Sequence, residues 1–195
     1  MRVLILFLVL FLGRYSDIYA QNTPQVSAVQ SVAKVDLERY LGTWYEVAAI
    51  PQYFQRKCIG NTSATYSRAE EGRIEVNNQC KTESGDSMNA SGRARVVDTT
   101  TNSKLEVTFV KLFGDWRFWI GGDYWVIGLE DNYQWAVVGH PSRKYGWVLS
   151  RTRALSPEAW KAVNAVLEKN GYDRCELLIS PQAEGDQRKV PLCQR

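Results

Sequence analysis

Few side chains in this chain of 195 residues could carry out catalysis or hold a metal ion. His140 is the single histidine, and the four cysteines contain no C-x-x-C pair. Zinc sites need clustered Cys and His ligands, so we expect no metal and no cofactor. His140 has no evident Ser or Cys partner, and the sequence contains neither a G-x-S-x-G motif nor a Walker loop. We therefore predict that the protein is not an enzyme.

Aromatic residues are the more unusual feature of the composition. The chain has 7 Trp, 10 Tyr and 6 Phe, against 2 Met. With 45% hydrophobic and 23% charged residues, the composition is that of a folded domain. The net charge is +3 and the basic residues form no stripe, which argues against a nucleic-acid partner. The aromatic residues are therefore candidates for ligand binding as well as for packing.

The N-terminal segment has the pattern of a secretory signal peptide. Arg2 precedes an apolar run over 3–12, and a small residue, Ala20, stands at a plausible cleavage site. The run is shorter than the roughly 20 residues that span a bilayer, and an uncleaved anchor is the alternative. We expect residues 1–20 to be removed and 21–34 to be a flexible lead-in. The protein would then be secreted, outside the cell or in a bacterial periplasm.

Export makes the four cysteines candidates for disulfide bonds. They are Cys58, Cys80, Cys175 and Cys193, and their spacing allows three pairings without choosing among them. Four free thiols in a chain without a leader are the alternative. Two sequons, at Asn61 and Asn89, would be glycosylated only in a eukaryotic secretory pathway.

Strands are the elements that we expect to position the candidate residues. Apolar and polar residues alternate over much of the middle of the chain. Alternating runs cover 63–67, 73–77, 88–96 and 105–109, and polar turns separate them. This period of two is typical of half-buried antiparallel strands joined in hairpins. Ala90, Gly92 and Ala94 are small residues on one face, and they would leave space inside the fold.

Three later runs, over 124–127, 135–138 and 147–149, are apolar on both faces, so both faces must be covered. A helix over 156–170 can supply the cover: Ser156 is a suitable N-cap and Pro157 suits the first helical position. A short strand over 176–180 follows the helix. Residues 182–195 form a polar tail.

The strands and the helix predict an all-β fold. Counting a strand near 43–50, eight sequential strands would close into an antiparallel up-and-down β-barrel over 35–181, with the helix packed outside and a short ninth strand. A two-sheet sandwich is the competing architecture, but no long crossover connection precedes the helix.

The run Gly42-Thr43-Trp44-Tyr45-Glu46 resembles the first sequence block of the lipocalin family. Residues 128–133 and 147–152 are similar to its second and third blocks, and the three blocks stand in the family's order. The stretches 36–50 and 139–147 resemble the branch that holds apolipoprotein D, the bacterial outer-membrane lipocalins and the plant temperature-induced lipocalins. Anchored bacterial members carry a lipidated N-terminal cysteine that this chain lacks, so we expect no lipid anchor.

The resemblance also implies a disulfide pairing. Cys58 and Cys193 match a bridged pair in apolipoprotein D, which leaves Cys80 with Cys175. In the family, the third-block arginine lies across the first-block tryptophan at the closed end of the barrel. The residues that we expect in this structural role are Gly42, Trp44, Tyr133 and Arg151.

The family's function implies a small hydrophobic ligand, such as a fatty acid, lysophospholipid, sterol or retinoid, which is carried or stored in the barrel. Trp147 lies four residues before Arg151 and should share its inward face. The ligand-binding residues that we expect are Ala48, Tyr66, Val76, Met88, Ala90, Val107, Phe109, Tyr124, Val126 and Trp147. A solidly packed core without a cavity is the alternative. Glu46 shares the parity of Trp44, and we interpret it as a buried structural carboxylate rather than a ligand contact.

Two loops, 51–61 and 112–122, should lie together at the open end of the barrel. Their apolar residues suggest either a lid or a rim that contacts a membrane, a lipid particle or a second copy in a weak homodimer. The expected rim residues are Tyr53, Phe54, Leu112, Phe113, Trp116, Phe118 and Trp119. Two other functions stay open: an enzyme that uses Cys80 as nucleophile, and a protein-interaction scaffold that stores no ligand.

Overall fold

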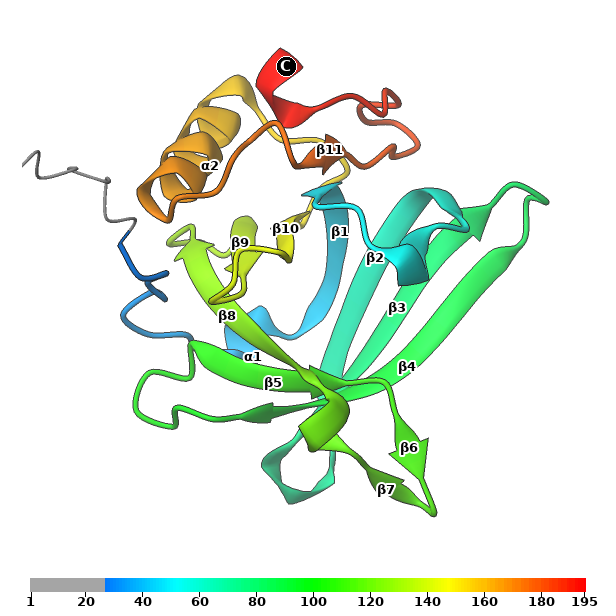
Figure 1. The fold of residues 1–195 in the computed structure, drawn as a ribbon, viewed down its shortest axis with the longest axis vertical. Helices are drawn as coiled ribbons and strands as arrows, with labels where there is room; N and C mark the ends of the chain where they lie inside the picture. The colour runs from blue at the N-terminus through cyan, green and yellow to red at the C-terminus, as the bar shows by residue number, and fades with distance from the viewer. Residues whose placement is uncertain (1–26) are drawn as a thin grey trace, which may run out of the picture.

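The computed structural model describes residues 27–195, and one closed β-barrel is the centre of the fold (Figure 1). Eight antiparallel strands follow one another around the wall in the order β1-β2-β3-β4-β5-β8-β9-β10, and β10 pairs with β1 to close it. The expected eight-stranded barrel is therefore confirmed, and the sandwich is excluded.

The strands of the barrel have the following bounds: β1 Gly42–Ala49, β2 Cys58–Arg68, β3 Ile74–Thr82, β4 Ser87–Val96, β5 Lys104–Thr108, β8 Gly122–Leu129, β9 Trp135–Gly139 and β10 Gly146–Ser150. Outside the barrel lie α1 (Leu37–Tyr40), the two-stranded hairpin of β6 (Lys111–Leu112) and β7 (Asp115–Trp116), α2 (Pro157–Lys169) and β11 (Leu178–Ile179). Single 3-10 turns occupy Tyr53–Gln55, Glu70–Gly72, Phe118–Ile120 and Leu192–Gln194.

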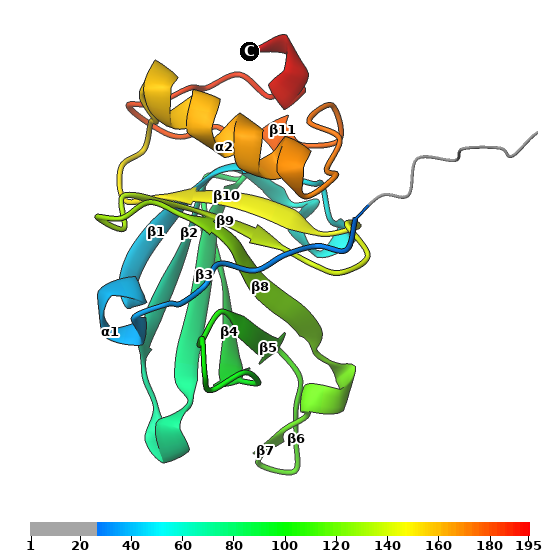
Figure 2. The same cartoon turned by 90° about the vertical axis from the view of Figure 1, so that its left-hand side faces the viewer.

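The helix α2 covers the outer face of the strands that are apolar on both sides. Figure 2 shows it lying across β9 and β10, and it also contacts β8. The side chains of Trp160, Val163 and Leu167 on the inner face of α2 are buried. Burying a side chain of this kind contributes about 1.5–3 kcal/mol. The inner faces of the same strands pack into the barrel, so the protein has two apolar cores separated by one sheet.

Local signals set both ends of α2. The Ser156 hydroxyl accepts a hydrogen bond from the Ala159 amide (3.2 Å), and Pro157 occupies the first helical position. Asn170 caps the C-terminus, and Gly171 follows with a φ of 70°, a left-handed conformation that suits glycine. The helix expected over 156–170 is therefore present with its predicted caps.

The chain after α2 bridges the part of the barrel wall where β1 and β2 are not paired. β1 and β2 pair only near the closed end, over 42–45 and 63–66, and they separate beyond it. The buried side-chain amide of Gln182 donates to the main-chain oxygens of Glu46 (2.9 Å) and Thr62 (2.8 Å), one on each strand. The C-terminal segment thereby replaces the missing strand-to-strand hydrogen bonds.

The disulfides join Cys58 to Cys80 and Cys175 to Cys193, so the pairing implied by the resemblance is wrong. Cys58 and Cys80 lie on neighbouring strands of one hairpin, with their Cα atoms 5.5 Å apart. Cys58 is therefore already bonded within the wall and does not reach the tail.

The second disulfide forms because the C-terminal tail turns back along β11. Ile179 N donates to Val190 O (2.9 Å), and Leu192 N donates to Leu177 O (2.8 Å). This return brings Cys193 beside Cys175, with their Cα atoms 5.0 Å apart. Each disulfide typically contributes about 2–4 kcal/mol.

The segment before α1 is more ordered than we expected. The predicted signal peptide and residues 21–26 lie outside the described residues. Residues 27–34, expected to be flexible, instead run along the barrel: Val29 is buried, and Val32 N donates to Val126 O (2.8 Å). Within residues 27–195, no helix is long and apolar enough to cross a membrane.

Candidate functional site

The closed end of the barrel is organised around Arg151. Its guanidinium lies 3.8 Å from the centre of the Trp44 ring, which is fully buried. The same guanidinium donates hydrogen bonds of 2.8–2.9 Å to the main-chain oxygens of Arg39, Leu41 and Thr43. One cation therefore joins α1 and the start of β1 to the end of β10.

Gly42 and Tyr133 lie at the same end. Gly42 has a φ of 93°, and a Cβ added to it would lie 3.4 Å from the Arg151 guanidinium. The Tyr133 ring lies under the Arg39 guanidinium at 4.1 Å, and its hydroxyl accepts a hydrogen bond from Asp36 N (2.9 Å). The structure thus places all four residues of the expected structural set at the closed end.

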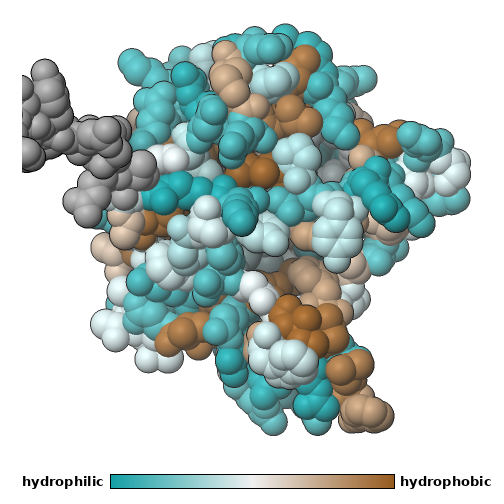
Figure 3. Space-filling view, in the orientation of Figure 1, coloured by the Kyte–Doolittle hydropathy of each residue, from teal (hydrophilic) through white to brown (hydrophobic). Residues whose placement is uncertain are grey.

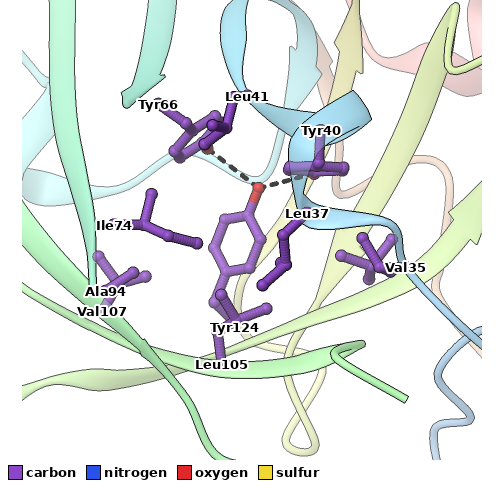
Figure 4. Close-up of a pocket in the computed structure, with 11 residues that line it drawn as sticks. Val35, Leu37, Tyr40, Leu41, Tyr66, Ile74, Ala94, Leu105, Val107 and Tyr124 are labelled. Atoms are coloured by element: carbon purple, nitrogen blue, oxygen red, sulfur yellow. Dashed lines mark hydrogen bonds between the residues drawn. The ribbon is translucent and has the colours of Figure 1, made fainter. Parts of the chain in front are cut away.

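Three tyrosines cover the inner side of this end and form the floor of the barrel. The Tyr124 hydroxyl is hydrogen-bonded to Tyr40 (2.9 Å) and to Tyr66 (3.0 Å), as the dashed lines of Figure 4 show. Burial raises the pKa of Tyr66 to about 12, and it raises the pKa values of Tyr40 and Tyr124 as well. The floor therefore presents neutral hydroxyl groups at any physiological pH.

A cavity of about 20 Å³ lies beside these tyrosines, which is room for about one water molecule. Its lining is almost wholly apolar: Val35, Leu37, Tyr40, Leu41, Tyr66, Ile74, Ala94, Leu105, Val107, Tyr124 and Val126. The expected residues Tyr66, Val107, Tyr124 and Val126 meet here, and Val76 belongs to the same apolar core. The lower half of the barrel is thus well filled.

Our expected ligand-binding set omitted several floor residues. Ile74 and Leu105 lie two positions from Val76 and Val107, so strand alternation alone could have added them. Tyr40 lies on the short helix α1, where strand alternation gives no guide.

Nearer the open end, the inner wall carries apolar side chains that are open to solvent, together with the polar Asn78 of β3, which lies opposite Ala90. Met88 and Ala90 share the inward face of Ala94 on β4; Met88 is half-buried and Ala90 is exposed. Phe109 is 44% exposed and packs over Gly92, where an added Cβ would lie 2.8 Å from the ring. Trp147 is half-buried and packs against the barrel core. We call these four residues, Met88, Ala90, Phe109 and Trp147, the upper wall.

Ala48 does not belong to the inner face, so its expected role is wrong. A β-bulge at Val47 interrupts the pairing of β1 with β10. Before the bulge, Glu46 lies opposite Leu149; after it, Ala48 lies opposite Val148, which belongs to the core under α2. The extra residue reverses the alternation, so Ala48 is buried beneath α2 rather than inside the barrel.

The two loops of the expected rim do not lie together, so that prediction is also wrong. Figures 1 and 2 both show the turn Tyr53–Gln55 well separated from the β6–β7 hairpin. Residues 109–121 fold against the outer wall: the Trp116 ring packs on Arg93 (5.4 Å), and the Phe118 ring packs on Arg95 (4.6 Å). Outward-facing arginines of β4 thus draw these two rings away from the open end.

The remaining rim residues stay exposed. Phe113 at the tip of the hairpin is 99% exposed and Trp119 is 80% exposed, and Leu112 is also exposed. Figure 3 shows apolar residues gathered along this hairpin as far as its tip. Tyr53 and Phe54 are exposed in the other loop.

Glu46 is buried, as its parity suggested, with 8% of its surface exposed. Its carboxylate accepts hydrogen bonds from Ser180 Oγ (2.6 Å) and from Gln55 Nε2 (2.8 Å). Burial raises the pKa of Glu46, and both hydrogen bonds oppose that rise. A cavity of about 340 Å³ lies against this carboxylate, between the loop 51–60 and the segment 178–181.

The side chains that could take part in catalysis make structural contacts. Cys80 is bonded to Cys58, so it provides no thiolate. His140 Nδ1 lies 2.8 Å from Ser142 Oγ, and its Nε2 lies 3.7 Å from an Asp123 oxygen. Within residues 27–195, no three His, Cys, Asp or Glu side chains are grouped to hold a metal ion.

The two sequons differ in their surroundings. Asn61 Oδ1 accepts a hydrogen bond from Ala183 N (2.7 Å), so its side chain holds the C-terminal segment. Asn89 is exposed on β4. A glycan would therefore be accommodated more readily at Asn89.

A family model described as a lipocalin-like domain matches residues 35–182. Among curated relatives, temperature-induced lipocalin-1 of Arabidopsis thaliana is 35% identical, over 80% of this chain and 84% of that protein. Outer membrane lipoprotein Blc of Escherichia coli strain K12 is 36% identical, over 74% and 78% respectively. Apolipoprotein D of Macaca fascicularis is 31% identical, over 75% and 77%.

Among solved structures, insecticyanin from the tobacco hornworm Manduca sexta has a TM-score of 0.65 to this chain. The sequence identity is 21%, with 81% of this chain and 86% of that chain covered. This likeness concerns the fold. The three curated relatives confirm the resemblance to the lipocalin family that the sequence blocks indicated. They also confirm the branch of that family.

Proposed function

This chain belongs to the lipocalin family, and from that premise we propose that its barrel binds and carries a small hydrophobic ligand. The observation that carries the proposal is the upper wall: Met88, Ala90, Phe109 and Trp147 are apolar and face inward, yet solvent reaches them. An apolar ligand would cover this surface, and each Å² removed from water contributes about 25 cal/mol. The filled floor below limits how deep the ligand enters.

The chemistry of the wall favours an elongated apolar body. Candidates are a fatty acid, lysophospholipid, sterol or retinoid, which have a hydrocarbon part and one polar end. The floor tyrosines are hydrogen-bonded to one another, so the apolar end of the ligand would point toward them and the polar end toward solvent.

The Trp147→Ala variant tests this function. It removes a large part of the upper wall, so we expect the affinity for a fatty acid or lysolipid to fall about tenfold or more. Fluorescence titration measures the affinity, and Trp119→Ala is the matched control because Trp119 is exposed on the outer wall side. Equal affinities of the Trp147→Ala variant and the unaltered protein would contradict ligand binding at the upper wall.

A second proposal concerns lipid surfaces. We infer that Phe113, at the tip of the β6–β7 hairpin, and Trp119, on the turn that follows the hairpin, contact a membrane or lipid particle. Both side chains are exposed, and the nearby cations are Lys111 and Arg117. Tyr and Trp side chains favour such interfaces, and cations favour anionic lipids.

We also propose export from the cytoplasm. Two disulfides are typical of an oxidising compartment, and a leader-like segment precedes the barrel. A mature protein whose N-terminus lies at residue 21, found by N-terminal sequencing, is the expected result.

A further inference from the structure

The cavity of about 340 Å³ is separate from the upper wall and from the floor. It lies between the loop 51–60, the end of β1 and the segment 178–181, and it shares no lining residue with the floor cavity. Its volume is in the range of small-ligand sites. Much of the lining is apolar, including Pro51, Tyr53, Ile59, Ile179 and Pro181.

Glu46 provides the buried charge of this cavity. Both carboxylate oxygens accept hydrogen bonds, and both donors, Ser180 and Gln55, are neutral groups. Among the described residues, no Lys, Arg or His nitrogen lies within 4.0 Å of this carboxylate. A buried carboxylate without a cation is costly, and a cation placed against it recovers part of that cost.

Two cations of the chain also line the cavity, Arg56 and Lys189, and both are exposed. Solvent and salt screen their charges, whereas Glu46 is shielded from water. The charge of Lys189 lowers the pKa of Glu46, but this influence is the smallest of those that act on the carboxyl. The internal cations therefore leave the carboxylate only partly compensated.

We propose that this cavity is a second binding site, which takes a small primary amine with an apolar body. The ammonium group would donate to the Glu46 carboxylate, and the body would pack on Pro51, Ile59 and Pro181. An anionic ligand would meet the Glu46 charge at close range. A metal ion would need further ligands, and no metal-binding group of side chains occurs among residues 27–195.

The test compares phenethylamine with phenethyl alcohol, which has nearly the same shape and no charge. Isothermal titration calorimetry of the full chain should give about tenfold or greater preference for the amine, since charged hydrogen bonds are the stronger ones. Glu46→Gln keeps the acceptor oxygen and removes the charge, so it should abolish the preference. Glu75→Gln, on the outer face of β3, is the matched control and should leave the preference intact.

Lys189→Ala distinguishes the amine from an anion. Removing this cation should raise the affinity for phenethylamine several-fold, because the ammonium no longer meets a like charge. Weaker amine binding in Lys189→Ala would contradict the proposal, as would tighter binding of phenylpropionate than of phenethylamine.

Two variants separate this cavity from the proposed ligand site at the upper wall. Fatty-acid binding should be unchanged in Glu46→Gln, and amine binding should be unchanged in Trp147→Ala. Amine binding that survives Glu46→Gln but is lost in Trp147→Ala would place the amine in the barrel and overturn this second site, whatever the outcome for the hydrophobic ligand.

Discussion

Arg151 is the residue on which the closed end most depends. It donates to three main-chain oxygens and covers the Trp44 ring. Arg151→Met keeps the stem and removes the donors, so we expect the free energy of unfolding to fall by about 2–4 kcal/mol. Urea denaturation measures it. Arg153→Met is the control, because Arg153 stacks on Tyr45 (4.7 Å) and makes one long hydrogen bond, to Asn61 Oδ1 (3.5 Å), so its effect should stay below about 1 kcal/mol.

Glu46 should give the fold a measurable pH dependence. Burial raises the pKa of its carboxyl above the ordinary value of 4.5, so the folded state holds the proton more tightly than the unfolded state. Its contribution to stability is therefore full below the unfolded pKa and is lost as pH rises through the folded pKa.

Glu46→Gln does not titrate and serves as the reference. We expect the free energy of unfolding of the unaltered protein, relative to Glu46→Gln, to decrease as pH rises above the ordinary carboxyl pKa of 4.5. Denaturation at a series of pH values measures this difference. A difference that is constant, or that grows with pH, would contradict the raised pKa of this buried carboxyl.

At the scale of elements, the β6–β7 hairpin and the turn Phe118–Ile120 that follows it carry the proposed contact with lipid. The double change Phe113→Ser and Trp119→Ser removes two exposed aromatic side chains, each worth roughly 1.5–3 kcal/mol when fully buried. We expect flotation with anionic vesicles to fall at least tenfold. The control is Tyr53→Ser with Phe54→Ser, in the loop that lies apart from the hairpin; an equal loss in this control would contradict a contact made by the hairpin.

The elements also show how far a single sequence can be interpreted. Alternation and capping residues predicted the strands and α2, because each depends on neighbours within a few positions. The bulge at Val47 has no local signal, and it moved Ala48 to the other face. We expected Trp116 and Phe118 at the open end, but their rings pack on arginines of β4 that are distant in the sequence.

The disulfide pairing also depends on contacts between residues that are distant in the sequence. Any of three pairings satisfied the spacing, and the choice depended on the tail turning back along β11. Gln182 is another residue whose role is set by distant contacts, since it bridges β1 and β2 more than a hundred residues upstream. Contacts of this kind need the fold before they can be recognised.

The whole molecule combines a tight floor with an open upper wall. Its floor cavity has room for about one water, whereas the inner face above it is mostly apolar and reached by solvent. α2 and the C-terminal segment cover the outside of the barrel, one disulfide joins β2 to β3, and the other holds the C-terminal tail. The aromatic residues are divided among the floor, the upper wall, the α2 interface and the hairpin, so packing accounts for only part of them.

Cross-linking with a photoreactive fatty acid tests the central claim most directly, because it reports where the hydrocarbon lies. The protein is saturated with a fatty acid that carries a diazirine in its chain, irradiated, digested and mapped by mass spectrometry. We predict one adduct per protein, on the inward residues of β4, β5 and β10 around Met88, Phe109 and Trp147. Adducts confined to the hairpin tip, or labelling without saturation, would contradict a ligand in the barrel.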